Sequence, residues 1–420
     1  MSWVGSRSEV SADGSAGGSD ALPVPLDGTP LYVHLPYCAA KCHYCDFFSV
    51  PADGQDIDAT LTAILTEARQ RAPRHPRTVF LGGGTPSLLS RVQLTRVLNG
   101  LDDITGFRSS AVEVTAECNP ESLDEDKASC LLELGVNRLS IGFQSLHDQV
   151  LQLLGRVHTV ADSFAAYAAA RRAGVRNVNI DVIYALPNQD LEQWNVDLER
   201  VLELAPDHVS AYNLTFEDDT LFRRWLEQGR LKKLPDELEL AFFEHTRRRL
   251  CAAGLAPYEI SNYARSGAPC VHNVNYWRNG DYLGIGPSAV SKVGTLRAGN
   301  ARSISEYRRC ISRDGSAAAW RERPPDAVRH AETWWLGLRL GEGLAARDAW
   351  SRAGMPGPWS PAKDPMVPIA ERLVAMGMLE RLEDRWMLTA RGLPVADAIA
   401  REFMDVSEPL AVDRTAESPR

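Results

Sequence analysis

The stretch Leu31-Tyr-Val-His-Leu-Pro-Tyr-Cys38-Ala-Ala-Lys-Cys42-His-Tyr-Cys45-Asp-Phe47 places three cysteines within eight residues, directly after a strand-like run. Thiolates spaced Cys-x3-Cys-x2-Cys on one short loop can wrap a single iron–sulfur cube. Three ligands leave one iron of the cube without a protein ligand, and a metal site needs such an open position to bind a substrate directly. We therefore predict a [4Fe–4S] cluster on Cys38, Cys42 and Cys45.

Zinc is the competing interpretation of this loop. Structural zinc takes four ligands, and the further ligand inside the loop would be His43. A ligand so close in sequence to Cys42 and Cys45 would strain the chelate, so the iron–sulfur interpretation is favoured. The other cysteines are scattered, and we expect them to be reduced, buried, small apolar side chains. They are Cys118, Cys130, Cys251, Cys270 and Cys310.

Strand-like runs alternate with helix-like stretches from about residue 30 to about residue 215. This spacing predicts repeated βα units and a parallel sheet. The predicted strands are Leu31–Leu35, Thr78–Leu81, Val112–Ala116, Arg138–Ile141, Val178–Ile183 and His208–Asn213. Six such units predict an α/β fold, a partial (β/α)6 barrel whose chemistry lies at the C-terminal ends of its strands.

Composition and pattern divide the chain into five predicted segments. They are a disordered tail over 1–28, the partial barrel over 29–265, a connecting segment over 266–323, a small C-terminal domain over 324–405 and a disordered tail over 406–420. The C-terminal domain reads as winged-helix-like. Its expected elements are a helix over Ile369–Met376, a hairpin of Leu379–Arg381 with Trp386–Leu388, and a helix over Ala390–Phe403.

The cysteine loop resembles that of the radical S-adenosylmethionine (SAM) superfamily. From Tyr32 to Phe47 the sequence resembles the oxygen-independent coproporphyrinogen III oxidases and their haem-chaperone relatives of HemW type, and the resemblance covers about residue 29 to about residue 405. It implies that SAM chelates the open iron through its amino and carboxylate groups. An electron from the cluster then cleaves SAM to a 5′-deoxyadenosyl radical.

The same resemblance implies a set of SAM contacts. Gly82-Gly-Gly-Thr-Pro86 follows the second strand, where glycines let backbone groups approach a ligand closely. Near the later strands, a carboxylate can accept from the ribose hydroxyls of SAM, an amide can pair with its adenine or ribose, and a guanidinium can bind its carboxylate. Taken alone, each of these polar residues is better explained as an ion pair or a cap. The implied SAM contacts are Tyr32, Tyr44, Gly83, Gly84, Thr85, Glu117, Gln144, Arg156 and Asp181.

Two features bear on which member of the family this is. The oxidases carry a further cysteine two residues after the third ligand, and here that position is Phe47. The segment His272-Asn-Val-Asn-Tyr-Trp277 resembles the His-Asn-x-x-Tyr-Trp signature of the haem chaperones. Histidine is a common haem ligand and aromatic rings pack on porphyrin faces. The alternative is that His272 caps a loop and the aromatic rings fill a domain junction, and Cys270 is a rival haem ligand.

The leading hypothesis is thus a haem chaperone that delivers haem to apo-haemoproteins and keeps a SAM-binding [4Fe–4S] core. We expect it to lack coproporphyrinogen oxidase activity; that activity, oxidative decarboxylation of coproporphyrinogen III, is the alternative function. Expected partners are haem, an apo-haemoprotein acceptor and an electron donor for the cluster. The net charge of −9 argues against nucleic acid. No apolar run is long enough for a transmembrane helix, so a cytoplasmic location is expected.

Overall fold

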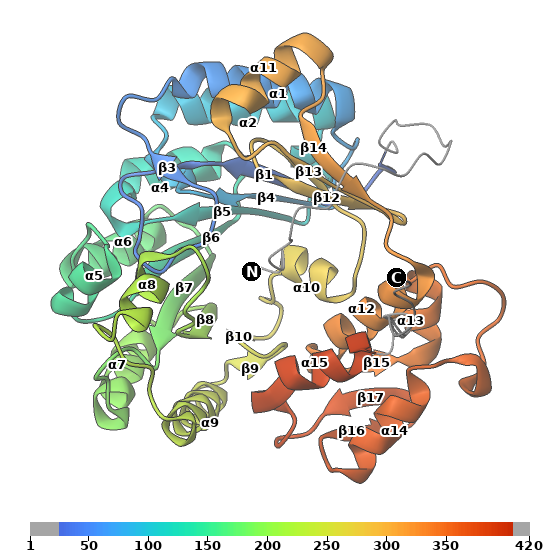
Figure 1. Cartoon of the computed structure of the whole chain (residues 1–420). Helices are drawn as coiled ribbons and strands as arrows, with labels where there is room; N and C mark the ends of the chain where they lie inside the picture. The colour runs from blue at the N-terminus through green and yellow to red at the C-terminus, as the bar shows by residue number, and fades with distance from the viewer. Residues whose placement is uncertain (1–24, 406–420) are drawn as a thin grey trace, which may run out of the picture.

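The computed structural model describes residues 25–405 of the chain (Figure 1). Of the two predicted disordered tails, residues 1–24 and 406–420 lie outside the described residues. Residues 25–28 are described. Gly28 N donates to Arg74 O at 3.1 Å, and Arg77 N donates to Gly28 O at 3.1 Å.

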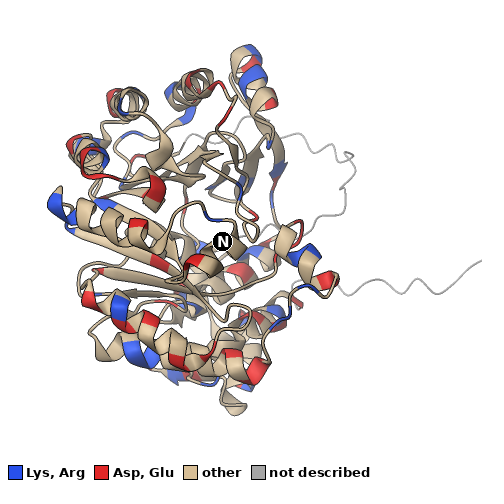
Figure 2. Cartoon of the chain, turned by 90° about the vertical axis from the view of Figure 1, so that its left-hand side faces the viewer, with Lys and Arg blue, Asp and Glu red and all other residues tan. Residues whose placement is uncertain are grey.

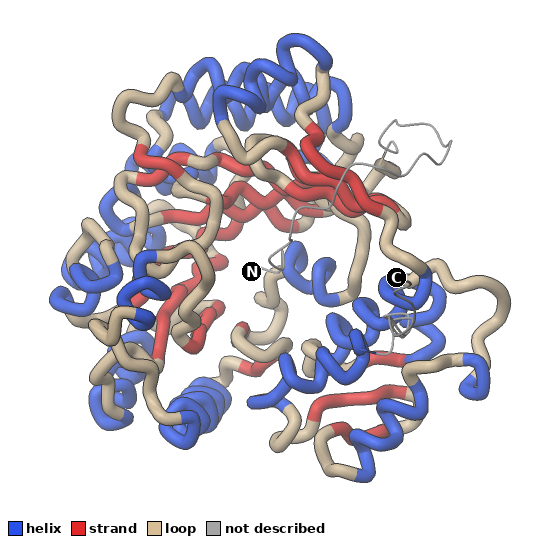
Figure 3. Tube along the Cα trace, viewed as in Figure 1, coloured by secondary structure: helices blue, strands red, loops and turns tan. Residues whose placement is uncertain are grey.

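A nine-stranded sheet forms the body of the molecule, in the order β11-β1-β4-β5-β6-β7-β8-β10-β9. All six predicted strands are present and neighbouring ones pair in parallel, which confirms the α/β prediction. They are β1 (Leu31–Leu35), β4 (Thr78–Gly83), β5 (Glu113–Cys118), β6 (Arg138–Gln144), β7 (Asn177–Tyr184) and β8 (His208–Asn213). Figures 1 and 3 show that this sheet curves into an open arc.

Three short strands extend the arc beyond the predicted ones. β11 (Leu283–Ile285) joins parallel to β1, while β10 (Asn262–Ala264) pairs antiparallel with β8 and carries β9 (Ala256–Pro257). Runs of two or three residues are too short to show a strand periodicity, so sequence patterning does not reveal them. The connecting segment therefore contributes the strand at one edge of the main sheet.

Helices cover the convex side of the arc, as Figure 3 shows. They are α1 (Ile57–Arg71), α2 (Arg91–Thr105), α3 (Phe107–Ser110), α4 (Glu125–Glu133), α5 (Asp148–Leu154), α6 (Val160–Arg172), α7 (Leu191–Glu203) and α9 (Asp236–Ala252). Local sequence sets their ends. Ser90 and Gln93 form a reciprocal capping box at the start of α2, and Gly106, with φ +70°, closes its end in the left-handed conformation.

The two faces of the arc differ in polarity. On β1, Leu31 and Val33 belong to the main hydrophobic core, as Val114 and Ala116 on β5 do. Alternate side chains of the same strands point to the opposite, concave face. These include Tyr32, Phe80, Glu113, Thr115, Glu117, Arg138, Ser140, Asn179, Asp181, His208 and Ser210. The concave face is therefore mostly polar, and a site for a polar ligand is built into the strand pattern.

The connecting segment folds back onto the barrel. Its helix α10 (Val271–Trp277) lies within the arc of the sheet in Figure 1. Its other elements are β12 (Val290–Val293), β13 (Leu296–Asn300), α11 (Ile304–Asp314) and β14 (Ala318–Glu322). Glu67 of α1, fully buried, accepts from Gly286 N at 2.9 Å, Asn300 Nδ2 at 2.8 Å and Tyr307 Oη at 2.7 Å. This carboxylate ties the segment to the barrel.

The C-terminal domain has its own apolar core around Trp334, Leu373 and Phe403. It contains α12 (Asp326–Leu338), β15 (Leu344–Ala345), α13 (Ala346–Arg352), α14 (Val367–Ala375), β16 (Leu379–Leu382), β17 (Arg385–Leu388) and α15 (Ala396–Asp405). The predicted helix and hairpin are present. The prediction that the last helix begins at Ala390 is wrong, because Gly392 and Pro394 interrupt the pattern and leave a 3-10 turn over Leu393–Val395.

Charged residues of both signs are interspersed along the helices on the side shown in Figure 2. Within residues 25–405, no helix is both long and apolar enough to cross a membrane.

Candidate functional site

The cysteine loop is closed by a pair of two-residue strands. Cys38 ends β2 (Tyr37–Cys38), which pairs in parallel with β3 (Val50–Pro51). Cys42 and Cys45 lie on the loop between them, and Cys45 N donates to Cys42 O at 3.4 Å. All three thiols are free and half-buried. The strand pair therefore fixes both ends of the segment that presents the cysteines.

The surroundings of the thiols suit a thiolate-bound cluster. Thr85 Oγ1 donates to Cys38 Sγ at 3.5 Å, and Arg156 Nη1 donates to Cys42 Sγ at 3.4 Å. Burial raises the pKa of the Cys38 thiol and raises the pKa of Cys45 to about 11. Cluster assembly must therefore displace protons from these thiols. Hydrogen bonds to sulfur are a normal feature of iron–sulfur sites, so the donor set fits a [4Fe–4S] cluster.

Among the described residues, no three His, Cys, Asp or Glu side chains are arranged to hold a single metal ion. His43, the zinc alternative, is held on both sides. Its ring nitrogen Nδ1 bonds to Leu153 O at 2.9 Å, and its backbone N–H donates to Leu154 O at 2.9 Å. Its own carbonyl accepts from Phe222 N of α8 (Leu221–Glu227) at 2.9 Å, and its ring meets Trp225 at 5.1 Å. His43 thus anchors the loop to α5 and α8.

The glycine run at the end of β4 makes close backbone contacts. Gly83 has φ +95°, and a Cβ on Gly84 would lie 2.5 Å from Leu35 O. Thr85 N donates to Tyr37 O at 2.7 Å, and Gly83 N donates to Glu117 Oε2 at 3.1 Å. Glycine is required here because the run packs directly against the start of the cysteine loop.

Glu117 and Asp181 place two carboxylates on the concave face. Burial first, and then the charge of Asp181, raise the pKa of Glu117 to about 7. Burial also raises the pKa of Asp181, although its oxygens accept from Ser140 Oγ at 3.0 Å and Asn179 Nδ2 at 2.8 Å. The charge of Arg138 partly opposes the rise in both pKa values. Buried carboxylates in this setting are suited to accept hydrogen bonds from a polar ligand.

Gln144 and Arg156 are placed by irregular backbone. Gln144 has φ +65° at the end of β6, where the pairing with β7 shifts register after Gly142. Arg156 Nη2 donates to Gly142 O at 3.0 Å and to Asn119 Oδ1 at 2.6 Å. The loop after α5 is thereby tied to the ends of β5 and β6.

Sequence reasoning missed two residues that organise the site. Asn119 bridges Arg156 and Thr85, since its Nδ2 donates to Thr85 Oγ1 at 2.9 Å. His34 bonds to Tyr32 Oη at 3.0 Å and to Phe48 O at 2.8 Å. The sequence signal for Asn119 was a polar residue directly after a strand, and the signal for His34 was a polar residue at an inward-facing position of a strand.

The structure brings most of the predicted SAM contacts together. Burial first, and then the charge of Glu117, raise the pKa of Tyr32, and Arg156 opposes the effect of burial on the pKa of Tyr44. Nearly all of these residues, whether they lie on the strands or on the neighbouring loops, stay partly accessible. The partly accessible ones are Tyr32, Tyr44, Gly83, Gly84, Glu117, Gln144, Arg156 and Asp181, while Thr85 is buried. The arrangement is an accessible polar site at the C-terminal strand ends, next to three thiols.

His272 lies at the other end of the barrel. It is 1% exposed, its Nδ1 bonds to Thr78 Oγ1 at 2.8 Å and its Nε2 bonds to Tyr276 Oη at 2.9 Å. Its backbone N–H donates to Glu113 Oε1 at 3.0 Å. Thr78 and Glu113 begin their strands, and Glu117 lies four residues further on, roughly 13 Å along the strand. His272 therefore stands apart from the cysteine loop, with both ring nitrogens engaged.

The neighbours of His272 are buried as well. The Cys270 thiol donates to Glu113 Oε1 at 3.4 Å and is fully buried. Burial lowers the pKa of His272 to about 3, so its imidazole is neutral. Trp277 lies under the Arg339 guanidinium of the C-terminal domain, 4.7 Å from ring centroid to Cζ. The geometry corresponds to the alternative in which this motif fills a domain junction.

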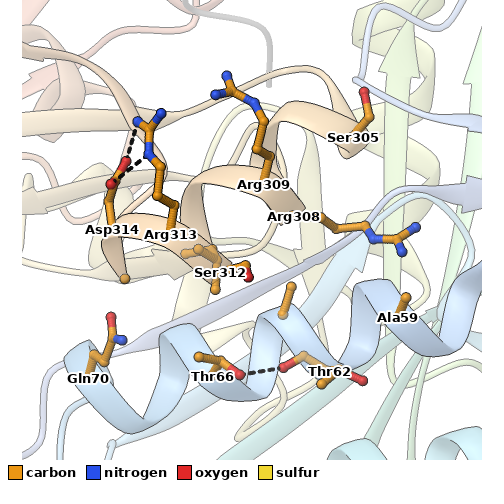
Figure 4. Close-up of a pocket in the computed structure, with 13 residues that line it drawn as sticks. Ala59, Thr62, Thr66, Gln70, Ser305, Arg308, Arg309, Ser312, Arg313 and Asp314 are labelled. Atoms are coloured by element: carbon orange, nitrogen blue, oxygen red, sulfur yellow. Dashed lines mark hydrogen bonds and ion pairs between the residues drawn. The ribbon is translucent and has the colours of Figure 1, made fainter.

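A groove of about 1110 Å³ lies on the surface between α1 and α11. Figure 4 shows that Arg309 and Arg313 point away from α1. Arg308 pairs with Asp56 at 3.3 Å, and Arg313 pairs with Asp314. The guanidinium groups on its rim do not converge, so this groove is not the candidate site.

Comparison with known proteins gives concordant matches. The family model of the Radical SAM superfamily matches residues 32–201. The chain is 31% identical over 379 residues to the heme chaperone HemW of Bacillus subtilis, covering 89% of this chain and 98% of that protein. It is 33% identical over 389 residues to the heme chaperone HemW of Escherichia coli, covering 91% and 99%. The solved structure of coproporphyrinogen III oxidase (HemN) from Escherichia coli, a radical SAM enzyme, matches with a TM-score of 0.77 at 25% identity and covers 91% of each chain.

Proposed function

This chain belongs to the HemW family of haem chaperones, within the radical SAM superfamily, and we propose that it binds haem and delivers it to apo-haemoproteins. The observation that carries the proposal is a match to two HemW proteins over 98% and 99% of their lengths. Both the barrel and the C-terminal domain are therefore shared with proteins of that name.

We propose that Cys38, Cys42 and Cys45 hold a [4Fe–4S] cluster with one iron open to SAM. When both are bound, the cluster supplies the electron that cleaves SAM. Arg156 holds a proton against the Cys42 sulfur, and Thr85 does the same for Cys38.

The other residues of the site are proposed SAM contacts. Glu117 and Asp181 accept hydrogen bonds from SAM. The Gln144 amide pairs with polar groups of SAM, and the Gly83–Thr85 backbone lines one side of the SAM site. Tyr32 and Tyr44 provide aromatic walls. Their partly accessible position beside the cysteine loop supports these roles.

Coproporphyrinogen oxidation is the second candidate, favoured by the likeness to HemN. Phe47 speaks against it. This side chain is 44% exposed, two residues beyond Cys45, where the oxidases have a further thiol. Phenylalanine can neither bind iron nor carry out thiol chemistry, so the chaperone function is preferred.

We propose His272 as the haem ligand, on the resemblance of its motif. Both ring nitrogens of His272 are hydrogen-bonded, so Thr78 or Tyr276 must release one of them before haem iron can bind. Because His272 is also buried, haem binding at this residue requires a local rearrangement around its ring. Cys270 is the rival ligand. An apo-haemoprotein acceptor, an electron donor and a cytoplasmic location remain predictions from the sequence.

The deciding experiment is anaerobic reconstitution with iron and sulfide, followed by haem titration and by incubation with coproporphyrinogen III and SAM. We expect stoichiometric haem uptake and no decarboxylated product. Robust decarboxylation would replace the chaperone proposal with the oxidase.

A further inference from the structure

A chain of hydrogen bonds crosses the polar interior of the barrel from α10 to Asp181. Cys270 N, at the start of α10, lies 3.4 Å from Tyr258 Oη, which lies 2.8 Å from His208 Nε2. His208 Nδ1 lies 2.6 Å from Asn179 Oδ1, and Asn179 Nδ2 lies 2.8 Å from Asp181 Oδ1. His208 is 0% exposed and Asn179 is 1% exposed, so the central links are sealed from solvent.

The acceptor at the end of the chain fixes the direction of every link. Asp181 Oδ1 accepts from Asn179 Nδ2, so the other end of the same amide, Oδ1, is the acceptor that faces His208. His208 must then carry its proton on Nδ1, and its Nε2 accepts from Tyr258 O–H. Tyr258 oxygen in turn accepts from Cys270 N–H. Each donation polarises the next group, which strengthens the following bond.

The protonation of His208 agrees with this direction. Burial first, and then the charge of Arg138, lower the pKa of His208 well below its usual value. The imidazole is therefore neutral and has one N–H, which the geometry assigns to Nδ1. Ser140 and Ser210 complete the arrangement. Ser140 Oγ donates to Asp181 Oδ2 at 3.0 Å, and Ser210 Oγ donates to Asn179 Oδ1 at 3.2 Å.

We propose that His208 is a positioning residue that acts through Asn179 to orient the Asp181 carboxylate for SAM. The inference rests on the proposed function of Asp181 as a SAM contact. His208 itself begins β8, at the far end of the strand from the site. Hydrogen bonds from Asn179 and Ser140 already hold the two oxygens of Asp181. The remaining lone pairs therefore point in one fixed direction, and a ligand need not order the carboxylate on binding.

Two substitutions separate positioning from packing. In His208→Asn, the amide nitrogen can take the place of Nδ1 and keep the donor to Asn179. In His208→Gln, the amide reaches the place of Nε2 and keeps the contact with Tyr258 but loses that donor. We expect cluster-loaded His208→Asn to bind SAM within about threefold of the wild type, and His208→Gln to bind about tenfold more weakly. The readout is SAM titration followed by the cluster's electron paramagnetic resonance signal.

The outcomes distinguish this inference from the proposed function. If wild-type protein binds no SAM, or Asp181→Ala binds it as the wild type does, the proposed SAM site is wrong. If Asp181→Ala is defective while the Asn and Gln variants of His208 weaken binding equally, or not at all, the inference fails and the site stands.

A second measurement needs no SAM. Histidine ¹⁵N chemical shifts of the full chain, with His208 assigned by its loss in His208→Asn, should report the tautomer protonated on Nδ1. A tautomer protonated on Nε2 would overturn the inference even if SAM binding follows the expected order.

Discussion

Arg156 Nη1 lies 3.4 Å from Cys42 Sγ, although 114 residues separate them. The guanidinium is also held by Asn119 and by Gly142 O, so its position is defined by the barrel and not by the cysteine loop. A fixed cationic donor beside a thiolate stabilises the more negative, reduced form of a cluster.

Arg156→Ala should therefore lower the midpoint potential of the reconstituted cluster while all three thiol ligands remain. An electron paramagnetic resonance redox titration measures this change. Arg172→Ala is the matched control, because Arg172 is an exposed arginine of α6 that pairs with Glu125 at 2.7 Å. A midpoint potential unchanged by Arg156→Ala would show that the guanidinium does not act on the cluster.

The cysteines divide into two predicted classes. Cys38→Ser, Cys42→Ser and Cys45→Ser should each abolish most of the brown chromophore, because each removes one thiolate. Iron analysis and the visible spectrum after anaerobic reconstitution provide the test. The controls are Cys118→Ser, Cys130→Ser, Cys251→Ser and Cys310→Ser, which should keep full iron content. Loss of iron in any of these four would disprove the three-ligand assignment.

SAM affinity should depend on pH through Glu117. Its pKa is raised to about 7, so below that pH the side chain is mostly protonated and is a poor acceptor for ribose hydroxyls. The ionised form binds better, so affinity should rise as pH increases through about 7 and level off above it, by up to about tenfold per pH unit on the acid side. SAM titrations of the cluster-loaded protein at a series of pH values measure the profile. Glu117→Gln should flatten it, and an identical profile in that variant would assign the titration to another group.

Haem uptake tests His272. His272→Ala would leave Thr78 and Tyr276 unpaired in a buried place, at a cost of about 1–3 kcal/mol for each group. His272→Gln is the better variant, because its amide can still bond to one of these hydroxyls but does not ligate haem. We expect lower haem uptake by absorption titration, with iron content and thermal midpoint close to those of the wild type. Unchanged uptake would move the ligand elsewhere, and Cys270→Ser is then the variant to measure.

Phe47→Cys tests the choice between the two functions. The substitution restores the thiol that the oxidases carry, yet we expect no decarboxylation of coproporphyrinogen III, because one thiol does not rebuild a substrate pocket. Product analysis under strict anaerobiosis gives the answer. Decarboxylation gained by Phe47→Cys would mean that this position alone separates the two activities.

Local patterns were enough for the six parallel strands and the loop of Cys38, Cys42 and Cys45. A buried parallel strand leaves a dense apolar signal, and thiols seven residues apart are close whatever the rest of the chain does. Parallel strands also place their C-terminal ends on one edge. The sequence thereby determined that the Gly83–Thr85 turn, Glu117 and Gln144 share a face with the cysteine loop.

The tertiary structure alone decided what depends on contacts distant in sequence. It brings Arg156 to Cys42, pairs β11 with β1, and carries the His272 motif to the barrel end away from the cysteines. It also links His208 to Asp181 through Asn179. A hydrogen bond is directional and short, so the tertiary structure decides which groups pair. Such pairs leave no periodic pattern in the sequence.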